Sequence, residues 1–198
     1  MLKEKLQELN ELISMYKTIA STKPQIVNGN FIKVGSAEYI LANGKTIKRE
    51  EIIKNGGRSS ASIILPITEN KEIILIVQPR VFTKLGVGVE LPAGYIDAYE
   101  TGKMAALREL KEETGYVPKK IIKVGEYYQD QGCSRALNEC FVAFGCQKQK
   151  KRNLDDDEFI SEFLCNYDEL LELMDMNYIC DAGSIITIEK AKKYLKKL

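Results

Sequence analysis

The chain has 198 residues, 44% of them hydrophobic and 29% charged, which allows one sizeable globular domain with its own core. Its 29 basic and 28 acidic residues give a net charge of +1, which excludes the electrostatic footprint of a duplex nucleic-acid binder or a polybasic membrane anchor. The chain contains no histidine, which excludes Ser-His-Asp and Cys-His catalysis and favours oxygen atoms as metal ligands.

The N-terminal segment and the cysteines indicate where the protein resides. Residues 1–13 are charged throughout and lack the apolar stretch of a secretory signal, and no segment approaches the ~18 apolar residues of a membrane span. The cysteines are odd in number and form no C-x-x-C pair, which argues against a disulfide framework and a zinc site. We therefore expect a cytoplasmic protein with reduced, mostly buried thiols that does not bind membranes.

The first quarter of the chain predicts one helix followed by a small β-rich part. Apolar residues recur at helical spacing over 2–20, so we expect an amphipathic helix that packs on the body or on a second subunit. Extended segments at 31–34 and 39–41 precede Asn43-Gly44, a strong tight-turn signal, and 47–53 predicts a further strand.

The remainder predicts strands and helices in alternation. Residues 61–67 and 72–78 are nearly continuous in Ile, Val and Leu, as in central strands that are covered on both faces. A helix is expected over 98–114, where Gly115 provides a stop signal. The other expected elements are strands at 121–128 and 139–144, an exposed loop at 147–158, and helices at 167–174 and 184–198.

These elements together predict an α/β (α+β) fold in which a mixed β-sheet is sandwiched between helices. We divide the chain into residues 1–57, an N-terminal helix with a β-rich extension, and residues 58–198, the catalytic domain.

The chemistry is concentrated in residues 94–116, GYIDAYETGKMAALRELKEETGY. With Glu109 at zero on a helical wheel, Glu112 lies at about −60° and Glu113 at about +40°. All three carboxylates therefore share one face of the helix. The same wheel predicts that the opposite face buries an apolar stripe of Met104, Leu107 and Leu110. Ala105 and Ala106 lie near the acidic face, where small side chains would leave room for a ligand.

Clustered carboxylates repel one another, and a divalent cation relieves that repulsion. Mg²⁺ prefers oxygen ligands and retains waters and phosphate oxygens in its coordination shell. Glu109 and Glu113 are one turn apart and suit a shared metal site, which Glu112 could complete, while Arg108 is placed to neutralise and orient Glu100. The alternative is a solvated helix face with i,i+4 ion pairs, which an E-L-K-E-E run alone would favour.

The complete pattern decides between these interpretations. Residues 94–116 resemble the Nudix box, G-x5-E-x7-R-E-U-x-E-E-x-G-U with U a bulky apolar residue, and meet every fixed position, with the aromatic Tyr116 at the last U. The resemblance implies a Nudix fold and a Nudix pyrophosphohydrolase, which uses Mg²⁺ or Mn²⁺ to split a nucleoside diphosphate linked to another group.

Two segments near the box resemble the ADP-ribose pyrophosphatase branch of this family. They are Gln78-Pro79-Arg80 and, leading into the box, Glu90-Leu91-Pro92-Ala93-Gly94. By this resemblance the carbonyl of Ala93 joins Glu109, Glu112 and Glu113 as a metal ligand. Arg80 and Glu90 become candidate substrate contacts.

Further along the chain the likeness continues in patches, from about residue 45 to residue 192. Gly132 lies where this branch often has a proline-glycine turn, and we assign it to substrate binding. Asp157-Glu158-Phe159-Ile160 resembles a segment that supplies a mobile-loop glutamate, which nominates Glu158 as the general base. The other candidate catalytic residues are Glu112, Arg108 and Glu100. The N-terminal β segment resembles the element through which this branch dimerises, so a homodimer is expected.

The expected reaction is hydrolysis of ADP-ribose or a related nucleoside diphosphate sugar to AMP and a sugar phosphate. Pro79 replaces the usual aromatic residue and Gln131 the usual proline, and both substitutions leave open a different nucleotide substrate: another nucleotide sugar, a dinucleoside polyphosphate or an oxidised nucleotide. A catalytically silent ADP-ribose-binding module is a further alternative, and the complete set of box carboxylates argues against it. Arg80 and Glu158 also admit a simpler interpretation as surface residues.

Overall fold

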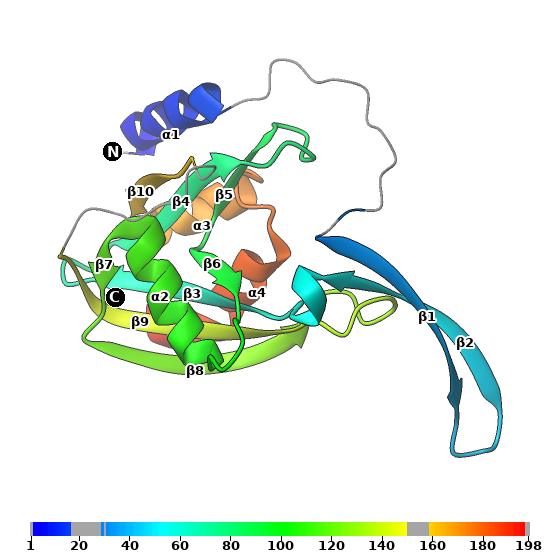
Figure 1. Ribbon diagram of the computed structural model, residues 1–198. Helices are drawn as coiled ribbons and strands as arrows, with labels where there is room; N and C mark the ends of the chain where they lie inside the picture. The colour runs from blue at the N-terminus through cyan, green and yellow to red at the C-terminus, as the bar shows by residue number, and fades with distance from the viewer. Residues whose placement is uncertain (1, 17–28, 30, 150–158, 197–198) are drawn as a thin grey trace.

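A mixed eight-stranded sheet forms the centre of the molecule (Figure 1). The computed structural model describes residues 2–16, 29, 31–149 and 159–196. The main strand order is β10-β4-β3-β9-β7, with β5 paired to β4, β6 to β3 and β8 to β9. The strands are β3 (Ala61–Thr68), β4 (Ile73–Pro79), β5 (Val87–Glu90), β6 (Ala93–Tyr95), β7 (Tyr116–Val117), β8 (Lys120–Tyr128), β9 (Leu137–Lys148) and β10 (Ser161–Cys165).

The central strands are buried on both faces, as their apolar sequences predicted. β3 runs parallel to β9 and antiparallel to β4. Side chains alternate along a strand, so Ile63 and Leu65 of β3 join the larger core cluster while Ile64 joins the smaller one on the opposite face. This coverage confirms the predicted sheet with helices on both faces.

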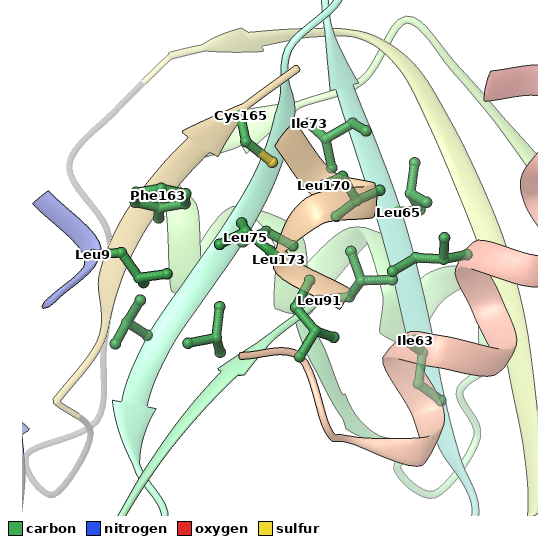
Figure 2. Close-up of a cluster of buried hydrophobic side chains, with 14 of the residues drawn as sticks. Leu9, Ile63, Leu65, Ile73, Leu75, Leu91, Phe163, Cys165, Leu170 and Leu173 are labelled. Carbon is green, nitrogen blue, oxygen red and sulfur yellow. The ribbon is translucent and has the colours of Figure 1, made fainter. Parts of the chain in front are cut away.

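Among the described residues, one helix covers the face of the sheet with the smaller core cluster, and three helices pack on the face with the larger cluster. α2 (Gly102–Thr114) packs Ala106 and Leu110 into the smaller cluster. α3 (Tyr167–Asp175), α4 (Ala182–Leu195) and α1 (Leu2–Tyr16) supply side chains to the larger cluster, shown in Figure 2. Leu9 of α1 is fully buried there, so the N-terminal helix is part of the same core. No helix in the described part of the chain is long and apolar enough to span a membrane.

The β-rich N-terminal part forms a hairpin that projects away from the sheet (Figure 1). β1 (Ile32–Ile40) pairs antiparallel with β2 (Thr46–Lys54), and the short 3₁₀ turn Asn55–Gly57 leads into the body. The Ile52 amide donates to the Cys133 carbonyl at 2.8 Å, and Arg135 forms an ion pair with Glu51. These contacts join the hairpin to the loop between β8 and β9.

Several predicted boundaries differ from the structure. The helix expected from residue 98 begins at Gly102, because Thr101 is its N-cap and accepts from the Met104 amide, while Glu100 accepts from the Asp97 amide in a preceding turn. Residues 147 and 148, expected in a loop, end β9, and the rest of that loop from 150 to 158 lies outside the described residues. Residues 17–20 and 197–198, expected in helices, also lie outside them.

Candidate active site

The carboxylates of α2 lie against the backbone of β6, at the end of the sheet where the chain turns into the helix. Gly94 of β6 makes this possible, because a Cβ at this position would lie 2.7 Å from one carboxylate oxygen of Glu109 and closer still to the other. One residue earlier, the Ala93 amide donates to Glu113 Oε2 at 3.1 Å. Glu113 is buried, and the side chain of Glu109 is only 13% exposed. The predicted acidic face is therefore a closely packed site.

The predicted apolar stripe of α2 is partly wrong. Met104 is 53% exposed, whereas Ala105, Ala106 and Leu110 are fully buried. The alanines were expected to leave room for a ligand. Instead Ala106 packs into the core cluster with Leu110, because a small side chain lets the helix lie close to the sheet. Their burial turns the helix so that Met104 faces solvent.

Arg108 is the centre of a hydrogen-bond network. Its Nε and Nη2 atoms each donate to Glu100 at 3.0 Å, which is the pairing that the sequence predicted. Nη1 donates to Glu109 at 2.6 Å and to Glu112 at 3.2 Å. Nη2 also donates to the Tyr95 carbonyl at 3.0 Å, which connects the helix to β6. One guanidinium thus orients three carboxylates.

Charge pairing in this network shifts the ionisation of its members. The hydrogen bonds from Arg108 hold the pKa of Glu100 below its ordinary value, and those bonds in turn raise the pKa of Arg108, so both groups stay ionised. Because Arg108 is about one third exposed, solvent screens part of this interaction.

Arg80 and Glu90 form a second pair on the neighbouring strands. Arg80 follows β4 and Glu90 ends β5, and Nε and Nη2 of Arg80 donate to the two Glu90 oxygens, each at 2.8 Å. The hydrogen bonds to Glu90 raise the pKa of Arg80, to which the charges of Asp181 and Glu113 also contribute. Arg80 is therefore within electrostatic reach of the acidic helix, and the structure brings these predicted residues together.

A cavity of about 530 Å³ adjoins this pair. It lies between the loop that connects β4 to β5 and the segment that connects α3 to α4. Its walls include Arg80, Glu90, Leu85, Tyr178 and Asp181. Pockets of a few hundred cubic ångströms with mixed apolar and polar walls are the usual size of small-molecule sites.

One predicted site residue, Gly132, is not part of this cluster, and another cannot be placed. Gly132 lies in the β8–β9 loop, where its amide donates to Asp130 Oδ1 at 3.2 Å, and it lines a groove with Tyr39 and Arg49 of the hairpin. Glu158 lies outside the described residues.

The structure also places Gly88 beside the site, a residue that the sequence did not nominate. Gly88 of β5 lines the cavity beside Arg80 and Glu90; a glycine inside a strand pattern is a known sign of close approach and was the available signal. The rings of Phe31 and Tyr95 meet edge to face with centroids 5.7 Å apart, and burial raises the pKa of Tyr95.

Comparison with known proteins identifies the family. A family model described as the NUDIX domain matches residues 57–180. The chain belongs to the Nudix family. The matched segment contains α2, β6 and the Arg80–Glu90 pair, and it ends one residue before Asp181, the N-cap of α4.

Relatives of this Nudix protein include named enzymes. It is 35% identical over 174 residues to an ADP-ribose pyrophosphatase of Bacillus subtilis (strain 168), covering 87% of this chain and 90% of that protein. It is 31% identical to a methanol dehydrogenase activator of Bacillus methanolicus, covering 83% and 87% of the two chains. A crystal structure of an ADP compounds hydrolase superposes with a TM-score of 0.72 at 20% identity, covering 88% of this chain and 91% of that chain, and confirms the Nudix fold.

Nudix hydrolases generally use a divalent metal ion, and the acidic cluster fits that requirement. Within the described residues, no group of three or more acidic or cysteine side chains has the arrangement of a metal site. In this structure Glu100, Glu109 and Glu112 are instead paired with the nitrogens of Arg108. Four carboxylates, including Glu113, against one guanidinium leave an excess of three negative charges, and oxygen ligands of this kind suit a hard divalent cation.

Proposed function

We propose that the chain hydrolyses ADP-ribose, or a closely related nucleoside diphosphate sugar, to AMP and a sugar phosphate. The observation that carries the proposal is the arrangement of α2 against β6 beside the Arg80–Glu90 pair, within reach of a substrate-sized cavity. The relative named ADP-ribose pyrophosphatase, which aligns with nearly the whole chain, supports this choice of substrate.

Glu109, Glu113 and the Ala93 carbonyl would hold Mg²⁺ (or Mn²⁺), with help from Glu112. When bound, the ion supplies positive charge that neutralises the diphosphate. Arg108 keeps Glu109 and Glu112 in place through its hydrogen bonds, and Glu100 holds Arg108. We assign these roles to Arg108 and Glu100 because of their hydrogen bonds.

The bond-breaking step requires a base and a stabilised leaving group. We assign Glu158 as the base that accepts a proton from the attacking water. The oxygen of this water bonds to one phosphorus, the bond from that phosphorus to the bridging oxygen breaks, and the other phosphate leaves with that oxygen. Arg80 faces the charge that develops there and stabilises it.

The cavity and the N-terminal hairpin would hold the rest of the substrate. Two carboxylates on the wall of the cavity, Glu90 and Asp181, can accept hydrogen bonds from sugar hydroxyls. Residues 1–57 contribute to the body through α1 and to dimerisation and substrate contact through the hairpin, with Phe31 against Tyr95 and Gly132 at the hairpin groove. We further propose that the protein is cytoplasmic. We also propose that it forms a homodimer, because the exposed apolar residues of β1 need a covering surface.

A substrate panel tests the proposal. The purified chain is incubated with Mg²⁺ and ADP-ribose, other nucleotide sugars, dinucleoside polyphosphates, an oxidised nucleoside triphosphate or ordinary triphosphates, and products are separated by anion exchange. The expected result is AMP and ribose 5-phosphate formed fastest from ADP-ribose. A parallel assay with Glu112→Gln controls for a contaminating hydrolase. A faster substrate would contradict the choice of ADP-ribose, and tight binding of ADP-ribose without turnover would favour a silent binding module.

A further inference from the structure

Gly88 occupies a position where any side chain would collide with the Arg80–Glu90 pair. It lies in β5 opposite Gln78 of β4, and alternation along a strand places it on the same face as Glu90. A Cβ on Gly88 would lie 2.7 Å from Arg80 Cγ and 2.8 Å from Glu90 Cδ, and closer still to a Glu90 oxygen. Real Cβ contacts are essentially never below 3.0 Å, so the pair needs the space that the glycine leaves.

The pair is held tightly enough for this space to matter. The two parallel hydrogen bonds from Arg80 to Glu90 form a bidentate pair, which fixes the plane of the guanidinium as well as its position. Glu90 is nearly buried, with 10% of its side chain exposed, and Gln78 also donates to it at 3.4 Å. A shift of the carboxylate would therefore move Arg80 with it.

The bidentate pair uses Nε and Nη2 and leaves Nη1 as the remaining nitrogen of the fork. An arginine already ordered by a partner loses less side-chain entropy when it binds a further anion. A glycine inside a buried strand is destabilising relative to alanine, and the space that it leaves for this pair offsets that cost.

We propose that Gly88 is a positioning residue. It leaves the space in which Arg80 stays paired with Glu90, so that Nη1 of the guanidinium meets the substrate diphosphate. This inference rests on the proposed function, because it takes Arg80 as a substrate contact. It assigns a role to a residue outside the box and outside the Gln78–Arg80 motif.

A double-mutant cycle tests the inference. We would measure kcat and KM for Gly88→Ala, Arg80→Ala and the double variant on ADP-ribose at saturating Mg²⁺. Arg80→Ala is expected to lower kcat/KM by roughly 10- to 100-fold, as for loss of a charged hydrogen bond. Gly88→Ala should lower it by about tenfold while the Mg²⁺ dependence stays unchanged. If Gly88 acts through Arg80, the double variant should lie within about twofold of Arg80→Ala, because coupled residues are not additive.

The matched control is Gly125→Ala in β8. A Cβ there also comes within 2.7 Å of a neighbour, the Cδ of the flexible Lys190 side chain, which can move aside, so wild-type kinetics are expected. Should Gly88→Ala fail to fold, Glu90→Gln removes the charge that holds Arg80 and keeps the shape. If Arg80→Ala then has little further effect on kcat/KM in the Glu90→Gln background, Arg80 acts only when Glu90 holds it and the proposal is supported; a full effect of Arg80→Ala in that background overturns it.

The remaining outcomes separate this inference from the proposed function. If Gly88→Ala costs the same factor with and without Arg80, Gly88 acts elsewhere and the proposal is overturned. Wild-type kinetics for Arg80→Ala also overturn it, while hydrolysis of ADP-ribose by the unmodified chain still stands. If the unmodified chain prefers another diphosphate, the proposed substrate fails, and the same cycle on that compound decides the role of Gly88. Absence of turnover on every compound overturns both.

Discussion

The hairpin β1–β2 and the central pair β3–β4 are both antiparallel and rich in isoleucine, yet their surroundings are opposite. Leu65 and Leu75 in the central pair are fully buried, whereas Val34 and Ile40 in the hairpin are 70% and 79% exposed. Helices cover the central pair on both faces, and a two-stranded hairpin is marginal without a covering surface. The body thus has its cover within the chain, and the hairpin requires another surface, which we propose to be a second copy.

A core substitution gives the largest expected effect on stability. Leu75→Ala should lower the free energy of unfolding by about 2–5 kcal/mol, because it removes a fully buried side chain and leaves a cavity. Val34→Ala, at an exposed hairpin site, should cost less than about 0.5 kcal/mol under conditions where the chain is monomeric. Urea titration followed by circular dichroism measures both. Equal losses would contradict the contrast between the two regions.

The next effect concerns activity and should belong to the body alone. Glu113→Gln removes one of the carboxylates that we assign to the metal, so kcat should fall by at least about 100-fold, as for other deletions of electrostatic groups in active sites. Glu189→Gln on α4 is the matched control, since its half-exposed carboxylate pairs with Lys192 on the surface. Steady-state assays with Mg²⁺ compare them. Near wild-type turnover for Glu113→Gln would refute the metal assignment.

A charge on the hairpin should change association and leave the body intact. Val34→Asp would bury a carboxylate in the proposed dimer interface, which is costly without a partner, so the dissociation constant should rise at least about tenfold. Light scattering after gel filtration gives the mass across a dilution series. Lys33→Asp, on the adjacent position and the opposite face of β1, is the control. A monomeric unmodified chain at every concentration would contradict the homodimer.

Much of the body could be predicted from the sequence because its signals are local. The continuous apolar runs of β3 and β4 and the box spacing both translate directly into geometry, and the Arg108–Glu100 pair followed from that spacing. The exposure of Met104 did not, because a helical wheel gives relative angles and cannot say which side the sheet will cover. Alanines carry too little hydrophobic signal to reveal that they pack at the closest approach.

Long-range features were harder to predict. β10 (Ser161–Cys165) follows a polar run and has only five residues, so its pairing with β4 decides its strand character. The exposure of apolar hairpin residues such as Val34 and Ile40 has no local signature either. Gly88 gave a signal, a glycine between two valines, but its meaning depends on Arg80, which reaches it only through the pairing of β4 with β5.

The smallest expected effect lies at the junction between the two regions. Arg135 and Glu51 form an ion pair that joins the β8–β9 loop to the hairpin, with Arg135 largely exposed. Such pairs contribute little to stability, so Arg135→Ala should leave the thermal unfolding of the body unchanged. Amide exchange at Ile52, whose N–H is bonded to Cys133 in the same junction, should become faster because the loop loses its attachment through Arg135. Adding salt to the unmodified chain should have the same effect, since it screens an exposed pair. A lower unfolding temperature of the body would show that the hairpin supports it, and the contrast drawn between the two regions would then have to be given up.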